Sequence, residues 1–407
     1  MSSLLLLLAC QEAAPDNHSA QDSEATEEPL VFASSATCGG CHPEQLAEWE
    51  GSMHAYAARS PVFDAMAGKA HRDTAGQVGT FCTGCHSVIG TLAGEGGQTT
   101  TADRSPLSNE GVTCTICHSA IDHQTPIGNA RLEYDTTAIH GPYASDYSDG
   151  HQTLQSDFTT APELCGACHD VFNFPGLNIE QAYAEYLEGP APEAGLRCQD
   201  CHMGPTPGLP VPRRWAPSAQ VEGVDLPDRE RASHRFVGPD YSLLDDFPYP
   251  DDPQASALAQ EEALARIQVL LENAVRLDGV LAGRNGEVVH LDLVLESLTI
   301  GHRVPTGFTS ERQLWLEVTA RDLSGQIVYQ SGDLDPYGDL RDTHSHAVQD
   351  GSVGLDEDLV NLQSRNVVRS QIPGQGSTAP IETAFPFDAE TIERHSLEPL
   401  ELRAIQY

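Results

Sequence analysis

Ten of the eleven cysteines in this chain of 407 residues belong to five copies of one short pattern. In each copy two cysteines are separated by two residues, and a histidine follows the second cysteine directly. Chance would produce only about 0.01 copies in a chain of this composition, and the pattern is the signature of covalent haem attachment. The sequence therefore predicts five c-type haems, one at each motif. The predicted attachment residues are Cys38, Cys41, Cys82, Cys85, Cys114, Cys117, Cys165, Cys168, Cys198 and Cys201.

The histidine of each motif is a candidate ligand of the haem iron. Because it follows a cysteine that would be bonded to the haem, it would reach the iron of that haem as the proximal axial ligand. Zinc knuckles occur in complementary pairs, which five copies do not allow, and a thioredoxin-like cysteine pair normally occurs once beside a βαβ unit. The predicted proximal ligands are His42, His86, His118, His169 and His202.

The second axial ligand decides whether such a haem only carries electrons or can also bind a substrate. The chain has 4 methionines but 17 histidines, so histidine must supply most second ligands. Twelve histidines lie outside the motifs, which exceeds the five that are needed and favours closed, bis-histidine haems. The predicted distal ligands are His54, His140, His151, His234 and His302. Four further histidines are secondary candidates for distal ligands: His71, His123, His344 and His346.

An apolar run at residues 4–9 is followed directly by Cys10. Its length fits the core of a signal peptide, and the sequence before the cysteine resembles the lipobox of bacterial lipoproteins. The first three residues carry no lysine or arginine, so a misassigned start with a chance cysteine stays an alternative. We expect residues 1–10 to be a signal peptide with lipidation at Cys10, and residues 11–35 to be a disordered acidic tether. The protein would then be exported as a periplasmic or outer-membrane lipoprotein, with the cell surface as a further option.

The rest of the chain divides by composition and periodicity. Residues 36–203 contain all five motifs, with short helices expected at 43–59 and 179–187, and would form an irregular and α-helical domain packed around the haems. Residues 204–253 are rich in proline and predict an extended connector. Apolar residues at helical spacing predict a helix over residues 253–276, assigned as a segment at 254–278. Alternating patterns at 288–295, 314–321, 327–331 and 400–407 predict strands, so residues 279–407 should form an all-β domain, most simply an Ig-like sandwich.

The formal net charge is −38, from 60 acidic and 22 basic residues. The acidic excess is spread through the chain rather than collected in one tail. Such a surface argues against nucleic acid and against anionic lipid as partners. We expect redox protein partners, with a basic one favoured, and contact with a membrane only through a lipid anchor at Cys10.

Several segments together resemble the bacterial multihaem cytochromes related to cytochrome c-554 and hydroxylamine oxidoreductase. The first motif is followed by Pro43, Trp49, Ser52 and His54, and later segments surround the motifs at 165–169 and 198–202. Residues 233–236 and 301–307 extend the similarity, the latter resembling a β domain that follows the haems in one subgroup. The resemblance implies that His54 is a distal ligand, and that His151, His234 and His302 also serve as distal ligands, as does His140. Members of this family include pure carriers, catalytic haem enzymes and surface conduits.

The leading hypothesis is an electron-transfer protein that relays electrons through five haems. The alternative is an enzyme that reduces or oxidises a small nitrogen or sulfur compound at one open haem. The few bases considered for such a site, Arg59, Arg72 and Arg131, count against an oxyanion pocket. A third reading is a structural role in a filament or larger complex, for which a ligand shared across subunits, such as His344 or His346, would be diagnostic.

Overall fold

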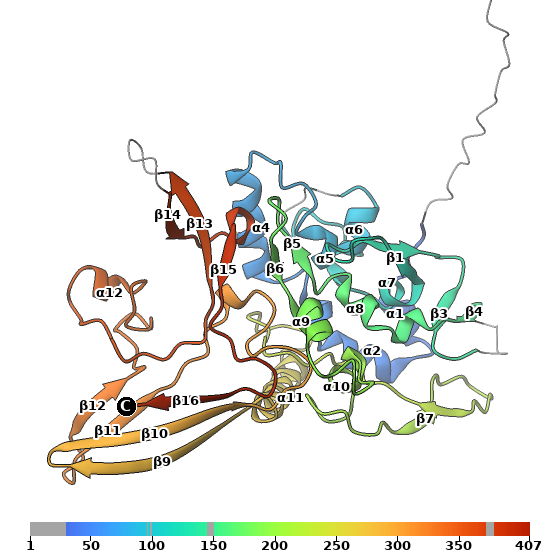
Figure 1. Cartoon of the computed structure of the whole chain (residues 1–407). Helices are drawn as coiled ribbons and strands as arrows, with labels where there is room; N and C mark the ends of the chain where they lie inside the picture. The colour runs from blue at the N-terminus through green and yellow to red at the C-terminus, as the bar shows by residue number, and fades with distance from the viewer. Residues whose placement is uncertain (1–29, 96, 98–99, 145–149, 372–377) are drawn as a thin grey trace, which may run out of the picture.

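The computed structural model describes residues 30–95, 97, 100–144, 150–371 and 378–407. The predicted signal peptide with Cys10, and most of the predicted tether, lie outside the described residues. Figure 1 shows two main parts: a helical and irregular part, drawn blue to green, and a β-rich part, drawn orange to red. We call residues 36–203 the motif region and residues 275–407 the β region.

The motif region is built from short helices that are separated by turns, many of them at glycine or proline. The helices are α1 (Ser35–Gly39), α2 (Pro43–Glu50), α3 (Met53–Tyr56), α4 (Pro61–Asp73), α5 (Thr83–His86), α6 (Val88–Leu92), α7 (Cys114–Ser119), α8 (Pro162–Gly166), α9 (Ala182–Glu188) and α10 (Cys198–His202), with 3-10 turns η1 (Ser108–Glu110) and η2 (Phe158–Thr160). The single helix predicted over 43–59 is two helices, because Gly51 ends α2 and the Ser52 side chain caps α3 by accepting from the Ala55 amide. The helix predicted at 179–187 begins later, at Ala182.

Small two-stranded sheets fill the spaces between these helices. They are formed by β1 (Ala120–His123) with β2 (Leu132–Tyr134), β3 (Ile139–Gly141) with β4 (Thr153–Gln155), and β5 (Val171–Phe172) with β6 (Asn178–Glu180). Only the pair β3–β4 is parallel. The strands are two to four residues long, so they fix local turns rather than form a layer.

The proline-rich connector leads from the motif region to the longest helix. It contains one short antiparallel pair, β7 (Trp215–Pro217) with β8 (Asp228–Glu230). Helix α11 (Pro253–Glu272) begins with Pro253 in its first turn and with the Asp252 side chain accepting from the Ala255 amide. It ends before the predicted residue 276, because the chain from Val275 onward pairs with β10 in a sheet.

The β region consists of three small antiparallel sheets. Their strand orders are β16–β10–β9, β11–β12 and β14–β13–β15. The strands are β9 (Val275–Asn285), β10 (Val288–Ser297), β11 (Val318–Arg321), β12 (Ile327–Ser331), β13 (Arg365–Gln371), β14 (Thr378–Glu382), β15 (Thr391–Glu393) and β16 (Leu402–Gln406), accompanied by η3 (Thr309–Glu311), α12 (His346–Gln349) and η4 (Pro386–Asp388). The predicted β-rich character is thus present, whereas the sheets of the described residues do not show an Ig-like sandwich. Long segments without strands, such as the one between β12 and β13, separate the sheets instead.

One apolar cluster holds the sheets of β10 and β11 together. Its most buried members are Leu362 and Leu397, which are 2% and 0% exposed, and Leu293, Leu295 and Ile405 complete the cluster. Leu293 of β10 lies directly across from Ile405 of β16 in the register of the sheet. These side chains make the β region a unit with a core of its own.

Polar contacts attach the β region to the motif region. The Asn173 side-chain amide donates to the carbonyls of Pro386 and Ala389, at 3.0 and 2.7 Å. The carboxylate of Glu185 on α9, which is 5% exposed, accepts a 2.6 Å hydrogen bond from the Thr306 hydroxyl and lies 3.4 Å from an Arg394 nitrogen. Across the described parts of the chain, no helix has both the length and the apolar character needed to cross a membrane.

Candidate haem centres

Each motif lies on or at the edge of one turn of helix. The His42 amide donates to the Cys38 carbonyl at 2.9 Å, and the His169 amide donates to the Cys165 carbonyl at 2.9 Å, as in an α-helical turn. Residues three apart in such a turn share one face, so both cysteines of a motif project together. The local sequence therefore forms the geometry that two thioether bonds to one haem require.

Four of the five motif histidines face a second histidine from a distant part of the chain. The ring centres of His42 and His151 are 6.3 Å apart, and those of His118 and His234 are 6.4 Å apart. The corresponding distances are 6.0 Å for His202 with His302 and 6.3 Å for His169 with His54. Three pairs are close to parallel, with interplanar angles of 19° to 26°, and the pair of His169 and His54 is tilted by 46°.

These distances fit an iron atom between the two rings. Metal–nitrogen bonds of about 2.0 Å, with ring centres about 1.2 Å behind each nitrogen, would separate the two ring centres by roughly 6.4 Å. Directly stacked rings would lie closer together, as Phe63 and His86 do at 4.3 Å. The donor set of two imidazoles at this spacing therefore fits bis-histidine haem iron at four motifs.

The other ring nitrogen of each motif histidine is held by the protein. The Nδ1 atoms of four of them lie at hydrogen-bond distance from backbone carbonyls. A ligating histidine usually donates its second N–H in this way, which directs Nε2 towards the metal. The pairs are His42 with Ser218 at 2.7 Å, His86 with Ala57 at 3.2 Å, His118 with His140 at 2.7 Å and His202 with Val237 at 3.2 Å.

His169 differs because its Nδ1 lies beside a carboxylate. The Glu180 Oε1 atom is 3.8 Å away, and the Glu180 side chain is 6% exposed. Burial by itself would lower the pKa of His169, but the Glu180 carboxylate outweighs it and raises that pKa to about 9. Sequence reasoning did not single out Glu180, since nothing in its local sequence connects it to the motif.

The backbone around His54 is fixed by a close approach of two segments. Gly111 has a φ of +77°, and a Cβ atom at this position would lie 2.3 Å from the His54 carbonyl oxygen. The next amide, of Val112, donates to the same carbonyl at 3.0 Å, and the Val112 carbonyl accepts from the Trp49 indole at 2.7 Å. Only glycine fits at position 111, and this contact sets where α3 presents His54.

The surrounding protein keeps several of the facing histidines neutral. Burial, aided by neighbouring histidine rings, lowers the pKa of His54 and of His234 to about 3. Burial lowers the pKa of His202 to about 4 in the same way. The neutral imidazole is the form that binds a metal, so these three histidines are suited to ligation at neutral pH, whereas the raised pKa of His169 favours its protonated form.

The motif of His86 is surrounded differently. Phe63 of α4 stacks on the His86 ring with an interplanar angle of 8°, and among the described histidines none faces His86 at the spacing of the other pairs. The guanidinium of Arg104 lies 5.3 Å from the centre of the Phe63 ring. Its side chain is 1% exposed and bonds to Asp64 at 2.7 Å, while its Nη1 atom has no protein partner in the described structure. Sequence reasoning overlooked both Phe63 and Arg104 at this motif.

His140 is the predicted distal ligand that faces no motif histidine. Its Nε2 lies 3.1 Å from Asp135 Oδ2, and its carbonyl accepts from the Nδ1 of His118. It therefore supports the His118 ring from behind. Of the secondary candidates, His123 packs near Phe158, and His344 lies 3.1 Å from Glu382 on the β region. No signal in the local sequence separates His140 from the four histidines that do face a motif.

Cysteines from different motifs lie next to one another. Cys38 and Cys114 lie close enough to shift each other's pKa, and so do Cys165 and Cys198. Cys85 together with burial likewise raises the pKa of Cys168, which places these two cysteines close together. The first motif therefore borders the third, and the fourth borders both the second and the fifth.

The comparisons with known proteins agree with this geometry. Residues 37–119, which include the first three motifs and His54, match the family Cytochrome c554 and c-prime. No curated protein and no solved structure matches the chain. The family implies c-type haem, electron transfer and export. Residues 37–119 are thus a multihaem domain of the cytochrome c554 and c-prime type.

Proposed function

We propose that this protein relays electrons through five covalently attached c-type haems, four of which are held between two histidines. The observation that supports this best is the set of four histidine pairs with ring centres 6.0 to 6.4 Å apart. When bound, haem iron supplies reversible one-electron oxidation and reduction. Two strong axial ligands close the iron to substrates, which suits a carrier.

The contacts between motifs suggest the order of the relay. Cys38 with Cys114 links the first and third centres, Cys85 with Cys168 links the second and fourth, and Cys165 with Cys198 links the fourth and fifth. Burial and then the neighbouring Cys168 raise the pKa of Cys117, which supports closeness of the third and fourth centres. We infer a chain from the first through the third to the fourth centre, with the second and fifth as its branches.

A second function is favoured by one observation at the second motif. His86 has no facing histidine among the described residues, and the buried Arg104 lies close enough to lower the pKa of His86 further, after burial itself. An open iron beside a positive charge could bind a small anionic nitrogen or sulfur compound. Under this alternative the other four centres would supply or remove electrons.

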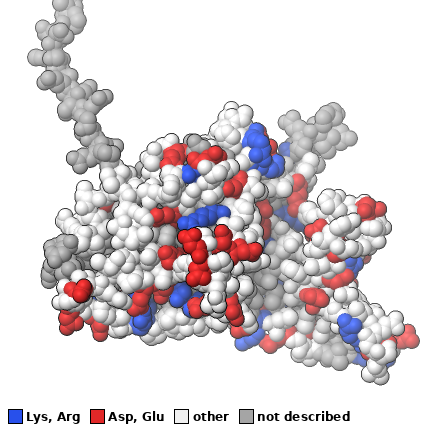
Figure 2. All heavy atoms as spheres, turned by 180° about the vertical axis from the view of Figure 1, so that it is seen from behind, with Lys and Arg blue, Asp and Glu red and all other residues white. Residues whose placement is uncertain are grey.

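The partners and the location follow from charge and from the N-terminal sequence. Figure 2 shows acidic side chains scattered over one face, with lysine and arginine only in small groups between them. A basic redox protein would be steered to such a surface, and this association should slow as salt is added. We further propose that the protein is anchored by lipid at Cys10, in the periplasm or at the outer membrane, and that it binds no nucleic acid.

Electron paramagnetic resonance of the oxidised, haem-loaded protein tests both functions. Mass spectrometry of the intact chain should first give five haems. The relay predicts low-spin signals for four haems, with the fifth either low-spin or high-spin. A high-spin signal worth one haem that nitrite, hydroxylamine or cyanide abolishes would favour the enzyme. Two or more high-spin haems that readily bind such ligands would overturn the relay.

A further inference from the structure

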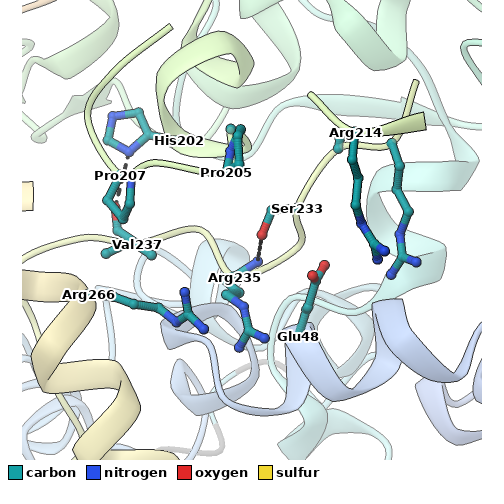
Figure 3. A pocket seen from close by; sticks show the side chains of 12 residues that line it. Glu48, His202, Pro205, Pro207, Arg214, Ser233, Arg235, Val237 and Arg266 are labelled. Atoms are coloured by element: carbon teal, nitrogen blue, oxygen red, sulfur yellow. Dashed lines mark hydrogen bonds between the residues drawn. The ribbon is translucent and has the colours of Figure 1, made fainter. Parts of the chain in front are cut away.

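A small cavity lies between the connector, α2 and α11, and four arginines line it. Its volume is about 190 Å³. Arg214, Arg231 and Arg235 come from the connector, and Arg266 comes from α11. Figure 3 shows Arg214, Arg235 and Arg266 around it, with Glu48 as an acidic wall residue. Four guanidinium groups at one place are unusual in a chain of net charge −38 with 22 basic residues.

Two of the four arginines, Arg231 and Arg266, hold buried donors that have no partner in the described structure, while Arg214 bonds to Glu44. Arg231 has a side chain that is only 6% exposed, and its Nη1 bonds to Glu44. Its Nε and Nη2 atoms have no partner in the described structure, and neither does the Nε of Arg266. A buried guanidinium with free donors costs free energy unless an acceptor binds them, and carboxylates match its fork geometry best.

The size and position of the cavity limit which chemical groups can occupy it. At about 30 Å³ per water, the cavity has room for roughly six waters, and it is below the range of pockets for larger organic ligands. Two carboxylate groups would fit. His202 forms part of the wall, and Ser233 and Arg235 flank His234, which faces His118. The cavity therefore borders the third and fifth proposed haem centres.

We infer that this arginine cavity binds the propionate carboxylates of the haem at the His202 motif or at the His118 motif. The inference rests on the proposed attachment of haem at these motifs. The oxidised haem carries one more positive charge than the reduced haem. The arginine charges would therefore destabilise the oxidised state relative to the reduced state and raise the reduction potential. The cavity would in this way set one step of the relay.

Replacement of Arg231 in the haem-loaded full chain tests the inference. Arg231→Gln should lower one of the five reduction potentials, measured by redox titration followed by absorbance and paramagnetic resonance, and Arg231→Lys should lower it less. Arg229→Gln is the matched control, because Arg229 lies two residues away and packs 5.2 Å over the Tyr143 ring instead. Its five potentials should equal those of the wild type. If Arg231→Gln fails to load haem, Arg266→Gln is measured in the same way.

The outcomes separate this inference from the proposed function. Fewer than five haems on the wild-type chain would contradict the function itself. Five haems with unchanged potentials in the Arg231→Gln and Arg266→Gln variants would overturn the inference alone. Isothermal titration calorimetry of the haem-loaded protein with inorganic phosphate tests for a free-anion site. Saturable phosphate binding that is lost in Arg231→Gln would mean that the cavity binds free anions, and this result would overturn the propionate assignment.

Discussion

In the β region, five buried apolar side chains, among them Leu397, form one cluster. The apolar side chains of the motif region form smaller clusters instead, such as Val88 with Ile89 and Ile116. A region of this length would normally bury a continuous apolar core. The motif region instead contains ten half-buried or exposed cysteines and seven of the nine motif or facing histidines, while His234 and His302 reach it from the connector and the β region. From this difference we expect that the β region is stabilised by its own side chains and that the motif region depends on the proposed haems. The two regions are joined by His302 and by the contacts of Glu185.

The largest expected effect comes from preventing haem attachment. In a full chain produced without haem, the motif region should lose its protection against amide hydrogen exchange, because the small apolar clusters alone cannot hold it. The strands β10 and β16 should stay protected, since their cluster contains no predicted haem ligand. Hydrogen exchange with mass spectrometry measures both regions in one sample. A motif region that stays protected without haem would contradict the comparison.

The converse change targets the β region alone. Leu397→Ala removes a side chain that is 0% exposed and should reduce the free energy of unfolding of the β region by about 2–5 kcal/mol. The haem absorbance spectrum should stay the same. Leu402→Ala is the control, because Leu402 is 66% exposed and its loss should change stability by less than about 0.5 kcal/mol. Chemical denaturation followed by fluorescence gives the values, and equal losses in both variants would argue against a separate β core.

His302→Ala acts on the junction between the regions. It should convert one low-spin haem to high-spin and leave the remaining signals as they are, because His302 is the only described histidine facing His202. His290→Ala provides the control, since His290 lies exposed on β10. Paramagnetic resonance counts the spins. An unchanged spectrum in His302→Ala would mean that another residue ligates this centre.

The smallest expected effect concerns one carboxylate within the motif region. Glu180→Gln should raise the reduction potential of the haem at His169, because the Glu180 charge beside Nδ1 favours the oxidised iron. The other potentials should stay the same. Glu188→Gln, at an exposed position on α9, is the control for loss of one negative charge. A redox titration in which both variants shift alike would show that Glu180 acts only through general charge.

Local sequence predicted the elements whose pattern is complete within a few residues. Strand β12 begins and ends at the predicted residues, 327 and 331. β9 was missed because its first residues continue the apolar spacing of α11, and Gly279 and Gly283 interrupt its alternation. β13, β14 and β15 were missed as well, since each pairs with a strand that the local pattern does not mark. Pairing between distant strands decides such elements more than propensity does.

The positions of the arginines near the proposed haem centres could not be predicted from local sequence either. Counting bases within the motif region argued against an anion pocket, yet the chain brings Arg214, Arg231 and Arg235 of the connector to the wall beside His202. Arg104 was overlooked beside His86 because its partner Asp64 is forty residues away in sequence.

The sequence by itself predicted the cofactor and its covalent attachment, because two cysteines three apart followed by a histidine are the signature of a c-type haem. It also supplied the surplus of histidines. Only the tertiary structure decided which histidine meets which motif, such as His54 with His169 and His302 with His202. It also separated His140 from the other candidates and left His86 without a facing histidine among the described residues. An axial pair is formed by residues that are far apart in the chain, so chain folding and not local spacing determines it.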